Sequence, residues 1–180
     1  MLTSTQRGAA GEQLLAACVT LTSRGDLELF KPLTDDDHTD ISAGRRGAVP
    51  ALAIQVKTAL HLDKHGLAVA RMAFPDSNPR EHPAFVYVIV FVQEAVLEAA
   101  WIVPSADFNR LTYRGKGPRG KGIELQFMAS PVRADRWAAF RVPRLDVGPK
   151  LIEFIDRLSE SAPPRVSGTH LVLRVSGRRS

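Results

Sequence analysis

The chain of 180 residues is long enough to form one domain with a sizeable core, and its hydrophobic share of 44% is typical of a globular protein. Its apolar runs are too short to span a membrane, and its N-terminal residues lack the charged start and apolar stretch of a signal peptide. The single cysteine, Cys18, excludes an internal disulfide and a cysteine-based zinc site, so we expect a cytoplasmic protein with no membrane partner.

The net charge of +5 is unevenly distributed along the chain. Residues 1–110 contain 10 Lys and Arg against 13 Asp and Glu, whereas residues 111–180 contain 14 against 6. An acidic half attracts metal cations and a basic half attracts phosphates, so this distribution favours a protein that binds both. A basic segment that only keeps the surface soluble stays open as an alternative.

The first predicted element is a helix over residues 8–23, where leucine, valine and alanine form an apolar stripe. Three strands are predicted next: one over residues 26–30, one that ends near residue 42, and one over residues 51–58. Glycines and arginines between residues 42 and 50 predict a turn that joins the last two strands in antiparallel fashion. Further strands are predicted over residues 66–72, 84–92 and 101–103. The β-branched and aromatic composition of residues 84–92 indicates a central strand.

In the second half, Ser105 is predicted to cap a short helix over residues 106–111. Residues 114–122 contain no apolar side chain, which predicts a mobile loop. The pattern is equally compatible with a flap that contacts phosphates and with a solvated loop that has no role. The cations of this loop that could contact phosphates are Arg114, Lys116, Arg119 and Lys121. Strands over residues 123–128 and 137–142, as a hairpin, and a helix over residues 151–158 complete a domain of residues 1–160. Residues 161–180 are predicted to form a basic tail or an edge strand.

Polar residues interrupt the strand predicted over residues 51–58. Because side chains alternate between the two faces of a strand, Gln55 and Lys57 lie on the face opposite Leu52, Ile54 and Val56. A buried lysine is costly unless a charge is paired with it, although Lys57 could also extend past the strand end to water. The predicted hairpin would bring the carboxylate of Asp40 to this face.

Glu12 joins Asp40, Gln55 and Lys57 as a fourth polar residue in an otherwise apolar pattern. It shares a stripe of the first predicted helix with Gly8, Leu15 and Val19. A glutamate on a core-facing stripe needs a partner or a metal ion. His38 lies two residues before Asp40; it could contact a metal, although such histidines are more often surface residues. The neighbouring Asp35, Asp36 and Asp37 are expected to form a solvated turn.

Glu12 in a glycine-rich first helix, Asp40 at a strand end and the step Gln55-Val56-Lys57 together resemble the PD-(D/E)XK nuclease superfamily, over about residues 8–58. The likeness is greatest to small bacterial members related to intron-encoded homing endonucleases, which share a Gln-x-Lys-Thr strand. The resemblance implies that Asp40, Gln55 and a backbone oxygen near Val56 bind Mg²⁺, for which Mn²⁺ can substitute. It also implies that Lys57 assists the nucleophile and that Glu12 supports the metal site. Gln55 stands where most members have a carboxylate, and its neutral oxygen brings less charge to a metal.

We therefore expect an α/β protein with a restriction-endonuclease-like core, in which helices flank a mixed central β-sheet. The expected function is Mg²⁺-dependent hydrolysis of DNA phosphodiester bonds. Cutting both strands needs two sites, so a homodimer or a higher homo-oligomer is compatible with this function. Two alternatives stay open: an inactive nucleic-acid-binding module of the same fold, which metal titration would distinguish, and a protein-interaction domain, which would show no salt-dependent DNA binding.

Overall fold

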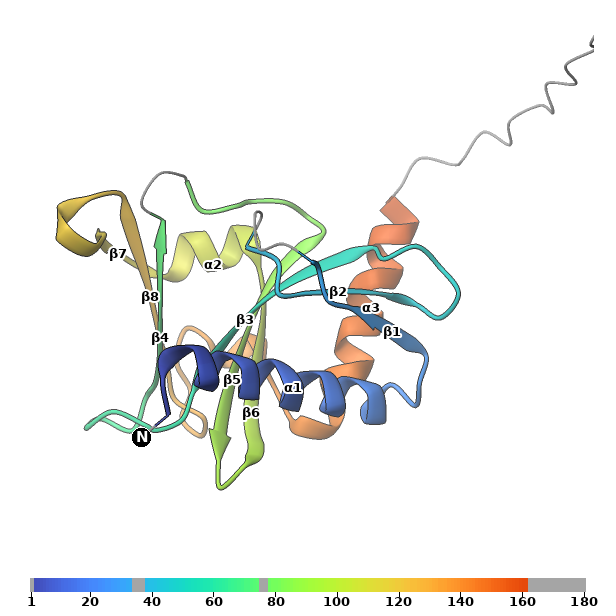
Figure 1. Ribbon diagram of the computed structural model, residues 1–180, viewed down its shortest axis with the longest axis horizontal. Coiled ribbons are helices and arrows are strands. Elements are labelled where there is room, and N and C mark those ends of the chain that lie inside the picture. The colour runs from blue at the N-terminus through green and yellow to red at the C-terminus, as the bar shows by residue number, and fades with distance from the viewer. Residues whose placement is uncertain (1, 34–37, 75–77, 162–180) are drawn as a thin grey trace, which may run out of the picture.

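The structure is a computed structural model that describes residues 2–33, 38–74 and 78–161 (Figure 1). Its helices are α1 (Ser4–Thr22), α2 (Ser105–Leu111) and α3 (Val147–Ser161). Its strands are β1 (Leu27–Phe30), β2 (Ile41–Arg45), β3 (Leu52–Ala59), β4 (Ala68–Phe74), β5 (Phe85–Gln93), β6 (Val96–Pro104), β7 (Tyr113–Lys116), β8 (Ile123–Ala129) and β9 (Arg141–Val142). Three short 3₁₀ turns lie at Pro118–Gly120, Ala138–Phe140 and Arg144–Asp146.

The central sheet has six strands in the order β1-β2-β3-β5-β6-β9. Strands β3 and β5 run parallel, and the other neighbours are antiparallel, so the sheet is mixed as predicted. Eight of the nine residues of β5 are buried, because this strand has a neighbour on each edge and packed side chains on each face. Such burial explains the unbroken apolar run that predicted a central strand.

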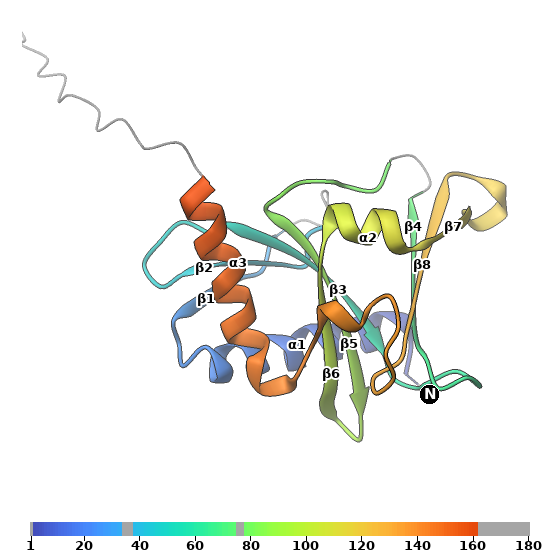
Figure 2. The same ribbon diagram turned by 180° about the vertical axis from the view of Figure 1, so that it is seen from behind.

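Each face of the central sheet has its own hydrophobic core. On one face, α1 and α3 contact each other and pack on alternate residues of β3 and β5, including Ile54 and Val88. On the other face, α2 and a second sheet of order β4-β8-β7 cover the intervening residues, including Tyr87 and Ile89. The hairpin of β7 and β8 lies at the opposite end of the molecule from α3 in both views (Figures 1 and 2).

Helix α1 begins at a capping box, in which the Gln6 backbone N–H donates to the Thr3 hydroxyl and the Thr3 N–H donates to the Gln6 side chain. Its buried side turns Leu15, Cys18 and Val19 to the core. The Cys18 thiol donates to the Arg144 carbonyl oxygen at 3.3 Å, and burial raises the pKa of this thiol, so Cys18 acts as a small buried hydrophobe.

Several predicted boundaries were wrong. Strand β2 continues to Arg45, so the turn to β3 is shorter than predicted. Ser105 is the first residue of α2 and Pro104 is its cap; the Ser105 hydroxyl instead bonds to the backbone N–H and C=O of His82. Residues 137–142 form no hairpin with β8, because Ala138–Phe140 is a 3₁₀ turn and β9 pairs with β6 in the other sheet.

The prediction of a loop over residues 114–122 was wrong for residues 114–116, which belong to a strand, and the predicted mobility stays a prediction. Tyr113–Lys116 form strand β7, which pairs with β8 in a register that sets Gly115 opposite Glu124. A backbone hydrogen bond from Gly117 to Gly122 closes the tip, and Gly120 and Gly122 adopt the positive φ angles that this turn requires. Residues 113–116 are held in a strand by backbone pairing with β8, which their own composition does not reveal.

The predicted tail or edge strand of residues 161–180 lies, apart from the backbone of Ser161, outside the described residues, as do Asp35, Asp36 and Asp37. Within the described part of the chain, no helix combines the length and the apolarity needed to cross a membrane.

Candidate active site

The candidate site forms where β3 loses its neighbour β2. Strand β2 pairs with β3 only as far as Ile41 opposite Ile54. The backbone N–H and C=O groups of every second residue face the same edge of a strand. Those of Val56 and Thr58 therefore face the edge of β3 that β2 no longer covers. Asp40 takes up the first of these positions: its N–H donates to the Ile54 carbonyl oxygen at 2.9 Å, and its carboxylate Oδ2 accepts from the Val56 N–H at 2.6 Å. The carboxylate is thereby fixed in the plane of the sheet.

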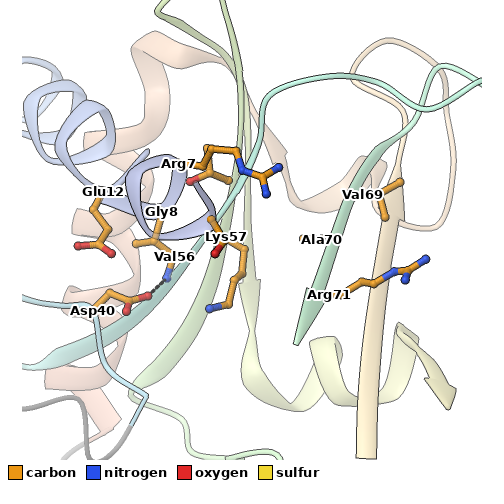
Figure 3. Close-up of a pocket in the computed structure, with 11 residues that line it drawn as sticks. Arg7, Gly8, Glu12, Asp40, Val56, Lys57, Val69, Ala70 and Arg71 are labelled. Atoms are coloured by element: carbon orange, nitrogen blue, oxygen red, sulfur yellow. Dashed lines mark hydrogen bonds between the residues drawn. The ribbon is translucent and has the colours of Figure 1, made fainter. Parts of the chain in front are cut away.

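A cavity of about 260 Å³ lies at this edge, between α1 and β4 (Figure 3). The charged side chains on its wall include Glu12 from α1, Asp40 and Lys57, which Figure 3 shows around the Asp40–Val56 hydrogen bond. The remaining lining residues are Ser4, Arg7, Gly8, Val56, Thr58, Val69, Ala70 and Arg71. The structure thus brings Glu12, Asp40, Val56 and Lys57 to one cavity.

Glu12 is held by a partner that the sequence did not indicate. Lys31, directly after β1, donates from Nζ to Glu12 Oε2 at 2.8 Å. The hydrogen bond and charge of Glu12, together with the charge of Asp40, raise the pKa of Lys31. Glu12 is only partly buried, with 20% of its side chain exposed, and it lies beside the buried stripe of α1 rather than within it. The ion pair therefore orients Glu12 at the edge of the cavity.

Gln55, which the resemblance implies as a metal ligand, does not line the cavity with the other three polar residues. It lies on the same face of β3 as Lys57, as predicted, yet it is 5% exposed and is not among the residues that line the cavity. Its side-chain oxygen Oε1 is buried and, within the described residues, has no hydrogen-bond partner. A buried amide oxygen without a donor is energetically costly, so this position calls for an explanation.

The other residues singled out in the sequence lie elsewhere. The ring of His38 packs edge-on against Phe74, with 5.7 Å between ring centroids, and does not line the cavity. The cations of the basic segment are exposed on the β7–β8 hairpin, and these are Arg114, Lys116, Arg119 and Lys121.

Besides Lys31, sequence reasoning missed three further cations near the site. Arg7 and Arg71 line the cavity, and Arg80 donates to the hydroxyl of Thr39, the neighbour of Asp40, at 3.4 Å. Arg71 had a usable signal, because it occupies a solvent-facing position of a strand whose buried positions are Ala70, Met72 and their alternates. Arg7 and Arg80 depend on packing between distant segments, which gives no local signal.

The site is poor in charged ligands for a metal. Among the described residues, no three His, Cys, Asp or Glu side chains converge in a way that could hold an ion. An ion at this cavity would therefore rely on one or two carboxylates, neutral oxygens, water and substrate phosphates, which is a donor set that Mg²⁺ accepts.

Comparison with known proteins places the fold. No protein-family model and no curated protein matches the sequence. Among solved structures, the chain is similar to a bacterial homing endonuclease, I-Ssp6803I, with a TM-score of 0.57 and 17% sequence identity over 89% of this chain and 98% of that one. At this identity the likeness shows a shared fold. It agrees with the predicted α/β architecture of a mixed sheet flanked by helices.

Proposed function

We propose that this protein is a metal-dependent endonuclease that hydrolyses DNA phosphodiester bonds at the cavity of Asp40 and Lys57. The observation that carries the proposal is the Asp40 carboxylate, fixed by the Val56 N–H at an open sheet edge, with Lys57 and Glu12 on the same cavity wall. The fold shared with a homing endonuclease supports the proposal. The sequence pattern by itself also points to Asp40, Lys57 and Glu12.

The residues present fit a divalent cation. Asp40 and Glu12 supply carboxylate oxygens, the carbonyl of Val56 faces the same edge, and Gln55 Oε1 is a buried oxygen in need of a partner. Mg²⁺ is usually held by one or two carboxylates and keeps several waters, so this set suffices. When bound, the ion would supply Lewis acidity at the phosphate and a water of lowered pKa.

The chain's own residues have separable roles in this proposal. The Val56 N–H holds Asp40 in one orientation, and Lys31 does the same for Glu12. Lys57 places a positive charge beside the scissile phosphate, where negative charge develops during hydrolysis. Arg7 and Arg71 flank the cavity and are suited to hold the neighbouring phosphates of the same strand.

Plasmid cleavage in Mg²⁺ or Mn²⁺ tests this function. Asp40→Asn and Lys57→Met should each reduce cleavage at least about 100-fold, the usual effect of removing one group that stabilises the transition state. Asp146→Asn and Lys64→Met are matched controls, because both residues lie outside the cavity and should leave the rate unchanged. Cleavage at the native rate in both site variants would rule out this cavity as the catalytic centre.

One observation favours a second candidate function. Gln55 contributes no charge and does not line the cavity, which suits a module of the same fold that binds nucleic acid without cutting it. Such a protein would bind DNA in a salt-dependent manner and take up no Mn²⁺ in a titration. Assembly into a homodimer or a higher homo-oligomer stays a prediction, and sedimentation in the presence of DNA would measure it.

A further inference from the structure

The second sheet has one face in the core and one face outside it. Burial alternates along β4 and β8, and Met72 and Leu125 are buried among the aromatic side chains of α2 and the central sheet. The intervening residues project from the opposite, outer face, because successive side chains of a strand point to opposite sides. Arg71 is exposed on this outer face, and Glu124 and Gln126 are half-buried on it.

The register of the three strands arranges the outer face in rows. Gln126 of β8 pairs with Arg71 of β4 on one side and with Tyr113 of β7 on the other. Paired residues project from the same face, so these three form a row about 10 Å across, from two strand spacings of about 4.8 Å. Glu124 lies in the next row, opposite Gly115 and about 6.7 Å further along β8. Within the described residues, the side chains of Arg71, Glu124 and Gln126 form no hydrogen bond or ion pair.

The row of Gln126 begins at the cavity of Asp40 and Lys57. Arg71 lines that cavity, and Figure 3 shows its side chain extending away from Lys57 toward β8. At the other end of the row, the exposed Arg136 packs on Tyr113, with its guanidinium carbon 4.0 Å from the ring centroid. Positive charge therefore lies on both sides of β8. DNA with one phosphate in the cavity would extend across the outer face of this strand.

We propose that β8 lies in the major groove of duplex DNA beside the scissile phosphate, and that Gln126 and Glu124 determine sequence specificity by binding base edges. The position of the DNA rests on the proposed function. The major groove is about 12 Å wide and admits β-strands, which the row of about 10 Å fits. Arg71 and Arg136 then face the phosphates that border the groove.

The two side chains of β8 have the chemistry that base edges need. The amide of a glutamine can bind N6 and N7 of adenine at once, and a carboxylate accepts from N4 of cytosine. A carboxylate on a DNA-facing surface repels phosphates, so the place of Glu124 on the middle strand, away from the flanking phosphates, suits contact with a base amino group. Gln126 and Glu124 are two residues apart on the strand, about 6.7 Å, which is the rise of about two base pairs. The two bases that they bind should therefore lie two base pairs apart.

Selection of bound duplexes from a randomised DNA library, followed by sequencing, measures base preference in the full chain without any need for cleavage. Gln126→Ala should reduce a preference for adenine at one position about 5-fold to 150-fold, and Gln126→Arg should change the preferred base there to guanine. Glu124→Ala should relax a preference for cytosine two base pairs away. Gln93→Ala and Glu98→Ala are matched controls on β5 and β6, because both residues are exposed and lie outside the cavity.

The outcomes separate this inference from the proposed function. A change of preferred base in Gln126→Arg cannot arise from loss of folding, since the variant still binds DNA. Native base preferences in all three β8 variants would overturn the inference, and so would native binding without any base preference. Plasmid cleavage by the native chain, measured alongside, tests the nuclease by itself. Changed preferences in a chain that does not cleave would support base recognition by a non-cleaving module, and a native chain that binds no duplex would refute both proposals.

Discussion

Two glycines one turn apart in α1 allow a matched test of how closely this helix packs on β3. A Cβ atom added to Gly11 would lie 2.8 Å from both Cβ and Cγ2 of Thr58 and would overlap the Thr58 hydroxyl oxygen. A Cβ atom added to Gly8 would have no atom within 4 Å. Both substitutions to alanine favour the helix equally, by about 0.5–1 kcal/mol, so their difference measures the contact at Thr58.

The magnitude follows from the overlap. Ordinary contact begins at 3.4 Å, so α1 and β3 must separate by at least about 0.6 Å to accept a methyl group at Gly11, and the Thr58 hydroxyl, which overlaps more deeply, must also move. Overpacking of this kind costs about 1–3 kcal/mol, and the gain in helix propensity offsets part of it. We expect Gly11→Ala to lower the free energy of unfolding by about 1–2 kcal/mol and Gly8→Ala to raise it by about 0.5–1 kcal/mol.

Thermal unfolding followed by circular dichroism measures both changes. For a chain of this size, about 1 kcal/mol corresponds to about 2–4 °C, so the two midpoints should move in opposite directions and differ by about 3–12 °C. Thr58→Ala should recover part of the stability that Gly11→Ala removes, because it deletes the hydroxyl and Cγ2 atoms that overlap. Equal stabilisation by the two alanines would show that α1 does not approach β3 as described.

Neutralising the exposed cations of the β7–β8 hairpin should reduce the salt dependence of DNA binding by about one unit of slope for each phosphate that the hairpin no longer binds, and an unchanged slope would leave the hairpin without a role in binding. Those cations are Arg114, Lys116, Arg119 and Lys121. Gln55→Glu should lower the unfolding midpoint in EDTA, because it buries a charge, and Mg²⁺ should restore it; a midpoint that does not respond to Mg²⁺ would argue against a metal at this position. Because burial raises the pKa of Tyr87 to about 12, the folded chain retains a proton that the unfolded chain releases near pH 10, so Tyr87 contributes stability below about pH 10 that is lost toward pH 12. Urea unfolding at increasing alkaline pH should therefore show a steeper loss of stability in the native chain than in Tyr87→Phe, and parallel curves would contradict the burial of the hydroxyl.

The sequence determined the elements whose signal is local. The alternation of residues 51–58, the unbroken apolar run of β5 and the apolar stripes of α1 and α3 each follow from a periodicity that burial imposes on neighbouring residues. Asp40 and Lys57 were identifiable because a charge in such a pattern needs a partner, and the structure places both at one cavity. The strands of the second sheet were partly visible, but their assignment to a separate sheet was not.

Only the tertiary structure decided which distant groups meet. The end of β2 opens the edge of β3 and lets the Asp40 carboxylate take a backbone hydrogen bond from Val56, which depends on register rather than on composition. Lys31 reaches Glu12 from the end of β1, and β5 sets Tyr87 beside Gln55. The strand conformation of residues 113–116 likewise comes from their pairing with β8. Periodicity in a sequence predicts that a side chain will be buried. The register between strands then determines which group that side chain contacts.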